Sequence, residues 1–146
     1  RAGRTADGPQ ARVIVQSMHP DNPAVLHAAA HEWDRFAELE LAMRAGAGLP
    51  PAKRLARMVF RDRDFDAAMA MANAAAQALS NTKEDIELLG PAPCPMARID
   101  DRHRIGLEVL ADTPGTLGRA LAKARLAAGF KPGGKVVIDV DPTTLL

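Results

Sequence analysis

The chain has 146 residues, a net charge of +1, an apolar content of 47% and an aromatic content of only 3%. The apolar content excludes a disordered chain, and the near-neutral charge does not indicate a nucleic-acid binder, so any basic surface must come from local clustering. The single cysteine, Cys94, excludes an internal disulfide framework and a cysteine-based zinc site, and predicts a reducing, cytoplasmic location. No apolar run is long enough to predict a membrane span.

The first third of the chain predicts a strand followed by two helices. Residues 1–11 are polar and are expected to form a loop, and the β-branched run of residues 13–16 predicts a short buried strand. Pro23 can begin a helix that runs to about residue 31, and a second helix is expected from about residue 32 to 45. Phe36, Leu39 and Met43 share one face of that second helix, at spacings of three and four.

Leu49-Pro50-Pro51 is the best candidate for a domain boundary. Two consecutive prolines cannot continue a helix, and they force the residues before them into an extended conformation. We therefore expect one unit over residues 1–50 and a second domain over residues 52–146.

The second part of the chain predicts six alternating elements. Strands are expected at 53–60, 86–89, 102–110 and 135–141, and helices at about 63–79 and 114–128. A Gly/Pro-rich stretch over residues 90–97 is expected to be a loop. The apolar stripe of the first helix is predicted at Phe65, Met69, Ala72, Ala76 and Leu79. Thr113, Pro114 and Gly129 have the chemistry that begins and ends a helix.

The order strand, helix, strand, strand, helix, strand predicts an α+β fold of the ferredoxin-like, split β-α-β type. Right-handed crossover connections would place both helices on one face of a four-stranded antiparallel sheet.

Three groups of basic residues are candidates for binding DNA phosphates or an acidic partner. The first and strongest is formed by Arg98, Arg102 and Arg104, at the junction of the Pro-rich stretch and the third strand. The alternative is that these arginines are solvated and pair with Asp100 and Asp101.

The second group is the basic stretch over residues 53–63, of which Arg54 and Arg57 are the candidates, although three aspartates lie at its end. The third group consists of Arg119 and Lys123, on one face of the second helix of the domain. Both groups could equally be solvated surface.

No metal site is predicted. His27 and His31 have the i, i+4 spacing of a metal pair, but no third ligand follows at a recognisable spacing. Asp139 and Asp141 are better explained as turn residues before Pro142.

Several short motifs occur together in an order that is typical of one protein family. They are Arg1-Ala-Gly-Arg4, Arg12-Val-Ile-Val-Gln16, His19-Pro20-Asp21, His31-Glu-Trp-Asp-Arg-Phe36, Glu38-Leu-Glu-Leu-Ala-Met-Arg44, Leu49-Pro-Pro51, Leu88-Leu-Gly-Pro-Ala-Pro93 and Asp139-Val-Asp-Pro142. In sequence and spacing the chain resembles the bacterial replication-restart DNA helicases of the primosomal protein N′ (PriA) family. No single tetrapeptide is specific, but the ordered set is.

The resemblance implies that residues 1–50 are the tail of the second helicase lobe. The remainder would be the C-terminal domain, which in the family binds branched or single-stranded DNA, single-stranded-DNA-binding protein and other primosome proteins. Arg1 and Arg4 would belong to the arginine-rich sixth helicase motif, where arginines reach ATP phosphates. ATP, magnesium and zinc are implied for the longer parent protein, an ATP-dependent 3′-5′ DNA helicase. No cofactor and no ATPase activity are expected for this fragment alone.

One departure from the family pattern bears on function. The family often has an Arg-aromatic-Arg-aromatic-Gln run in the third strand, whereas this chain has Arg102-His103-Arg104-Ile105-Gly106. The basic residues remain, but base stacking and the contact that uses the Gln are in question. An alternative interpretation is therefore a ferredoxin-like protein-interaction or small-ligand regulatory domain without a DNA role.

Overall fold

In a computed structural model, residues 13–131 and 133–143 are described. The chain divides into two compact units, with the boundary between Leu41 and Ala42. The predicted boundary at residues 50–52 lies within the second unit. None of the helices in the described ranges is long and apolar enough to cross a lipid bilayer.

The first unit contains helix α1 (Pro23–Ala30), and helix α2 (Trp33–Gly46) begins in it. Asn22 caps α1 by accepting a hydrogen bond from the backbone N–H of Ala24 at 2.9 Å, and Pro23 takes the first helical position. His31 ends α1 in a left-handed conformation, with φ of 58°. Both helices lie close to their predicted ranges.

The strand predicted at residues 13–16 is absent, and this prediction is wrong. Val13, Ile14 and Val15 are exposed by 52%, 82% and 67%, and no described residue of the first unit forms a strand with which they could pair. A β-branched run forms a stable strand only beside another strand. Of residues 13–41, none is buried.

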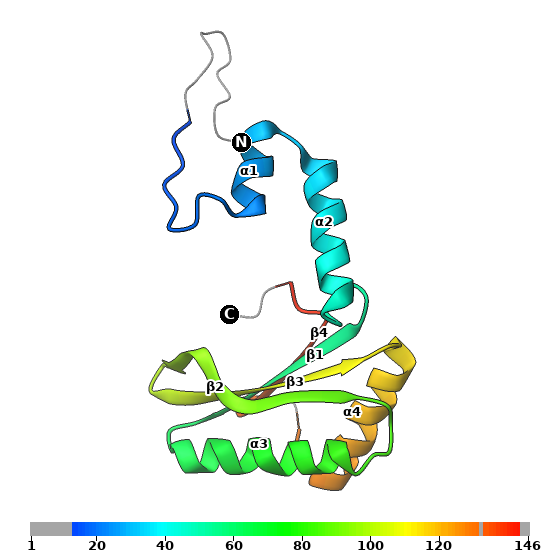
Figure 1. Ribbon diagram of the computed structural model, residues 1–146. Helices are drawn as coiled ribbons and strands as arrows, with labels where there is room; N and C mark the ends of the chain where they lie inside the picture. The colour runs from blue at the N-terminus through cyan, green and yellow to red at the C-terminus, as the bar shows by residue number, and fades with distance from the viewer. Residues whose placement is uncertain (1–12, 132, 144–146) are drawn as a thin grey trace. The chain divides into compact units, whose positions relative to one another are not determined.

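The second unit is built on a four-stranded antiparallel sheet. Its strands are β1 (Arg54–Asp62), β2 (Glu87–Ile99), β3 (Arg102–Ala111) and β4 (Val136–Val140), in the spatial order β2-β3-β1-β4. Helices α3 (Phe65–Ser80) and α4 (Pro114–Ala128) lie on the same side of this sheet and pack on each other (Figure 1). The structure confirms the predicted α+β class with an antiparallel sheet; the assignment to the ferredoxin-like type stays a prediction.

The core lies between the sheet and the two helices. Strand alternation directs Ala56, Met58 and Phe60 of β1 into it, and these residues face Val109, Leu107 and Ile105 of β3 in register. All six are fully buried, and burial of each large side chain contributes about 1.5–3 kcal/mol.

The predicted apolar stripe of α3 is only partly correct. The buried residues are Ala68, Ala72, Ala75 and Leu79, whereas Phe65 is 40% exposed. Phe65 instead contacts the ring of His103 edge-on, with centroids 5.6 Å apart. The fully buried face of α3 consists of three alanines and Leu79, and Met69 and Ala76 of the predicted stripe are partly buried against the same core.

The Pro-rich stretch predicted as a loop is part of β2. Pro91, Pro93 and Pro95 lie within that strand, which pairs with β3 through two register shifts. A proline lacks the N–H needed by a central strand, but β2 is at the edge of the sheet, where one side of the strand has no neighbour among the described strands.

Helix α4 agrees closely with its predicted signals. Thr113 caps it by accepting a hydrogen bond from the Thr116 N–H at 3.1 Å, and Gly129 ends it in a left-handed conformation with φ of 67°. Its buried residues, Leu117, Ala120 and Ala124, complete the core.

Candidate functional site

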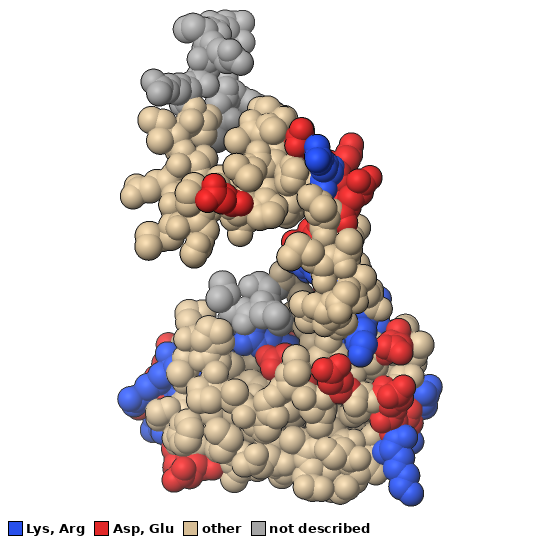
Figure 2. Space-filling view, in the orientation of Figure 1, with Lys and Arg blue, Asp and Glu red and all other residues tan. Residues whose placement is uncertain are grey.

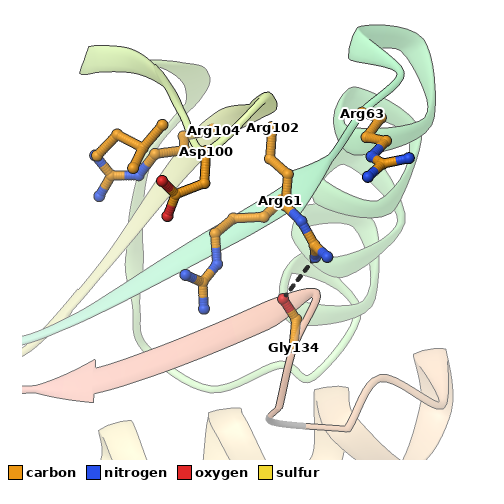
Figure 3. Close-up of a pocket in the computed structure, with 7 residues that line it drawn as sticks. Arg61, Arg63, Asp100, Arg102, Arg104 and Gly134 are labelled. Carbon is orange, nitrogen blue, oxygen red and sulfur yellow. Dashed lines mark hydrogen bonds between the residues drawn. The ribbon is translucent and has the colours of Figure 1, made fainter.

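A pocket lined by four arginines lies at one end of the sheet. It has a volume of about 540 Å³, and the elements that form it are the end of β1, the β2–β3 hairpin and the segment before β4. The lining residues are Arg61, Arg63, Ile99, Asp100, Arg102, Arg104 and Gly134. Figure 3 shows the labelled side chains around this hollow, with Arg102 reaching toward Gly134. We call these seven residues the arginine pocket.

Strand alternation explains why arginines meet at this position. Phe60 points into the core, so its neighbour Arg61 must point to the face of the sheet that α3 and α4 leave uncovered. The same alternation on β3 places Ile105 in the core and Arg104 on the face opposite to α3 and α4. The two-residue turn of the hairpin, Asp100-Asp101, has φ values of 49° and 59°, as a type I′ turn requires.

Two of the arginines are direct cross-strand neighbours. Arg61 of β1 is paired in register with Arg104 of β3. Like charges directly opposite each other on a sheet are destabilising, so a bound anion would relieve a repulsion built into the fold. Nε of Arg61 is also buried and has no hydrogen-bond partner among the described residues.

Arg102 and Arg104 each donate one hydrogen bond to a backbone carbonyl group of the protein. Nη1 of Arg102 donates to the carbonyl oxygen of Gly134 at 3.4 Å, and Nη1 of Arg104 donates to that of Met96 at 3.2 Å. Each guanidinium carries five N–H donors, so most donors of the pair remain available to a ligand. Asp100 is the single carboxylate among the described residues that line the pocket.

The structure separates Arg98 from the other two members of its predicted group. Arg98 forms an ion pair with Asp101 across the hairpin turn, whereas Arg102 and Arg104 line the arginine pocket. The alternative considered for this group, pairing with the aspartates of the turn, is therefore present at Arg98.

The second predicted group is engaged in ion pairs on the sheet. Arg54 pairs with Asp141. Arg57 is 5% exposed and its Nε lies 3.6 Å from Oε1 of Glu108, its cross-strand neighbour. Neither residue lines the arginine pocket.

The third predicted group, Arg119 and Lys123, converges on one carboxylate. Arg119 Nη2 lies 3.0 Å from Glu84 Oε2, and Lys123 Nζ lies 2.6 Å from Glu84 Oε1. Hydrogen bonds from Arg119 and then Lys123 hold the pKa of Glu84 below its ordinary value of 4.5. A DNA phosphate at these residues would have to compete with Glu84.

Some predicted features give no site in this structure. Arg1 and Arg4 lie outside the described residues. His27 Nδ1 is 2.9 Å from Glu32 Oε2, and His31 ends α1. Among residues 13–131 and 133–143, no group of three or more His, Cys, Asp or Glu side chains is placed to hold a metal ion.

Sequence reasoning did not select Arg61 and Arg63 as site residues. They stood in a basic stretch whose aspartates were expected to neutralise it, and one of these, Asp62, does pair with Lys135 at 2.7 Å. That hydrogen bond lowers the pKa of Asp62. The pairing register of β1 with β3, which brings Arg61 to Arg104, was the missing information.

On the face shown in Figure 2, Lys and Arg atoms of the described residues are interspersed with Asp and Glu atoms and form no continuous basic patch. The arginine pocket is a local concentration of positive charge on a nearly neutral protein.

Comparison with known proteins identifies relatives over the whole chain. The family model described as "Primosomal protein N C-terminal domain" matches residues 45–143. The "Replication restart protein PriA" of Treponema pallidum (strain Nichols) is 34% identical over 100% of this chain and 22% of its own length. The proteins of the same name from Haemophilus influenzae and Borreliella burgdorferi are 30% and 24% identical over 99% and 92% of this chain, and the match covers 20% of each.

The chain thus spans about a fifth of the length of these relatives. The match of the family model covers all four strands and the two helices of the second unit. On this evidence the chain belongs to the family of the primosomal protein N C-terminal domain.

Proposed function

We propose that this chain is the C-terminal part of a replication-restart helicase, and that it binds branched or single-stranded DNA and replication partners at stalled forks. The observation that carries the proposal is the arginine pocket, in which four guanidinium groups line one hollow beside the carboxylate of Asp100. Guanidinium groups bind phosphate in a bidentate manner, and contacts to phosphate position a protein on nucleic acid without reading its sequence.

The relatives support the biological setting of this proposal. They are named replication restart proteins, and restart of replication takes place on DNA. ATP hydrolysis, magnesium and zinc would belong to the remainder of the longer protein, since this chain covers about a fifth of its relatives. The cytoplasmic location expected from the single cysteine is part of the same proposal.

Binding of DNA by the pocket should be electrostatic. Among the described residues that line it, none is aromatic, and Ile99 is the one large apolar side chain. Stacking of bases on aromatic rings, the usual source of additional affinity for single strands, is therefore missing at this position. We expect little sequence preference and a steep dependence on salt.

A titration of the chain with labelled forked DNA at several salt concentrations tests the proposal. We expect affinity to fall as salt rises. The double variant Arg102→Gln/Arg104→Gln should bind more weakly, with a log–log salt slope lower by about one unit for each phosphate that it no longer neutralises. Arg125→Gln, at an exposed arginine of α4 outside the pocket, is the control for loss of a surface cation.

Two results would contradict the proposal. One is a parent chain that does not bind forked or single-stranded DNA at low salt. The other is a double variant that binds like the Arg125→Gln control, which would favour a protein-interaction or small-ligand regulatory domain without a DNA role.

A further inference from the structure

The four arginines of the pocket come from two neighbouring segments of the chain, the end of β1 with the bend after it and the start of β3. Arg61 and Arg63 belong to β1 and the residues directly after it, and Arg102 and Arg104 belong to β3. Arg102 and Arg104 are two apart on β3, so they are directed to the same face of the strand and their Cα atoms are separated by about 7 Å. Arg63 lies in the bend that directly follows β1, two residues after Arg61. The two strands lie about 5 Å apart.

The register of the sheet groups these arginines into two pairs. Arg61 lies opposite Arg104, and the next pair along the strands is Asp62 with His103. Arg63 follows Asp62, and Arg102 precedes His103, so these two arginines flank the same cross-strand pair on its outer side. The four arginines thus form two pairs, which we call the grid: Arg61 of β1 opposite Arg104 of β3, and Arg63, in the bend after β1, beside Arg102 at the start of β3.

The two pairs differ in how they are anchored. In the inner pair, the Arg61 side chain is partly buried, with its Nε out of contact with solvent, and Arg104 donates to the carbonyl oxygen of Met96. In the outer pair, Arg102 donates to Gly134 and Arg63 is exposed, at the turn between β1 and α3 (Figure 3). The inner pair is therefore the more preorganised of the two, because less side-chain freedom is lost there on binding.

We propose that the grid binds two consecutive phosphates of one DNA strand, with Arg61 and Arg104 sharing one phosphate and Arg63 and Arg102 sharing the next. This inference rests on the proposed function and specifies its ligand. One phosphate between two facing guanidinium groups can accept hydrogen bonds from both, and it removes the repulsion between them. The backbone of the bound strand would then run along β1 and β3.

A nucleic-acid strand fits these observations better than an acidic peptide does. A peptide segment usually adds apolar contacts or strand pairing to its charges. The arginine pocket offers one large apolar side chain among its described residues, Ile99, and β1 and β3 are already paired on both of their edges. A phosphate backbone carries regularly spaced negative charges and does not need apolar side chains in its binding site.

Double-mutant cycles on the whole chain test the pairing. The probe is a fluorescent oligothymidylate, and each arginine is replaced by Gln singly and in pairs. Each substitution within the inner pair should weaken binding by about ten- to hundredfold, as expected for a charged hydrogen bond. Arg61→Gln and Arg104→Gln should be non-additive, as should Arg63→Gln and Arg102→Gln, whereas Arg61→Gln and Arg102→Gln should add.

The salt slope provides an independent measure of the number of phosphates. Removing either pair should lower the log–log slope for the single strand by about 0.7, and removing both pairs by about twice that value. Arg61→Lys should keep the slope and reduce affinity, because it retains the charge without the planar fork, and this variant distinguishes a weakened interaction with DNA from a disrupted fold. Arg125→Gln should leave slope and affinity unchanged.

A chemically modified strand tests whether the two phosphates are consecutive. In an oligothymidylate whose other linkages are neutral methylphosphonates, two adjacent charged linkages should support tighter binding than two that are separated by a neutral one. Equal binding of the two strands, or additivity within both pairs while the parent chain still binds DNA, would overturn the grid and leave the proposed function standing. Failure of the parent chain to bind any DNA, with an oligoaspartate peptide bound at the same arginines, would overturn both.

Discussion

At the scale of single residues, the carboxylate of Asp100 is the negative charge among the four arginines of the pocket. It reduces the potential that a bound anion experiences. We expect Asp100→Asn to tighten binding of oligothymidylate by up to about fivefold, the range of exposed charge interactions. Fluorescence anisotropy at low salt measures this gain, and Asp112→Asn, 74% exposed and outside the pocket, is the acidic control. Weaker binding by Asp100→Asn would mean that Asp100 orients the hairpin and does not compete with the ligand.

Glu84 gives a prediction about stability and pH. Its pKa in the folded protein is held below the ordinary value of 4.5 by hydrogen bonds from Arg119 and Lys123. A carboxyl group with a lowered folded-state pKa stabilises the protein above its unfolded-state pKa, and this contribution disappears as pH falls through the folded-state value. Glu84→Gln should therefore be less stable than the parent near neutral pH, and the difference should shrink below about pH 4.5.

Urea unfolding over a series of pH values measures that difference, and Asp85→Asn is a neighbouring exposed control. A gap between Glu84→Gln and the parent that is constant with pH would show that the ionised carboxylate is not what stabilises this contact.

At the scale of secondary-structure elements, two glycines allow a matched comparison. Gly90 in β2 has φ of +99°, and a Cβ at this position would lie 2.9 Å from the carbonyl oxygen of Gly106. Gly90→Ala should destabilise the protein by about 1–3 kcal/mol through backbone strain and the close contact. Gly118, exposed within α4, has open space around it, and Gly118→Ala should stabilise by about 0.5–1 kcal/mol. Chemical unfolding of both variants measures the two effects, which should have opposite signs.

Local sequence features, such as helix caps, prolines and alternating apolar residues, predicted those elements whose boundaries are set by single residues. Thr113, Pro114 and Gly129 define α4, and the strand predicted at 102–110 is β3. Local signals failed where a neighbour in space decided the outcome. Residues 90–97 could be recognised as part of a strand only once β2 was known to be an edge strand, and residues 13–16 lack any strand beside them among the described residues.

The candidate site was predictable to the same extent. Arg102 and Arg104 could be identified at the start of the third strand, because the Pro-rich stretch that they follow is close to them in sequence. Arg61 and Arg63 could not, because a sequence does not state which residue of β1 lies opposite which residue of β3. Arg119 and Lys123 were predicted from helix periodicity alone, and periodicity does not reveal Glu84, which is distant in sequence.

At the scale of the whole molecule, the two units differ in how much apolar surface they bury. Residues 13–41 include no buried side chain, and Trp33 is 72% exposed, whereas β1 is buried from Leu55 to Phe60. Segments with few buried contacts open locally with little free energy. We expect amides of α1 and α2 to exchange hydrogen much faster than those of β1 and β3. Native-state hydrogen exchange followed by mass spectrometry measures this difference. Equal protection of the amides of α1 and α2 and those of β1 and β3 in a monomer would contradict the prediction.

At the end of β1, neighbouring residues have different roles. Selection for folding and selection for ligand binding therefore act on adjacent codons. Met58 and Phe60 are fully buried between sheet and helices, while Arg61 faces the arginine pocket. In a mutational library of this strand, substitutions at Met58 and Phe60 should reduce the yield of folded protein, whereas Arg61 should tolerate replacement in a yield screen and fail in a selection for DNA retention. Insertion of a single codon within β1 would exchange the two faces and remove both properties together.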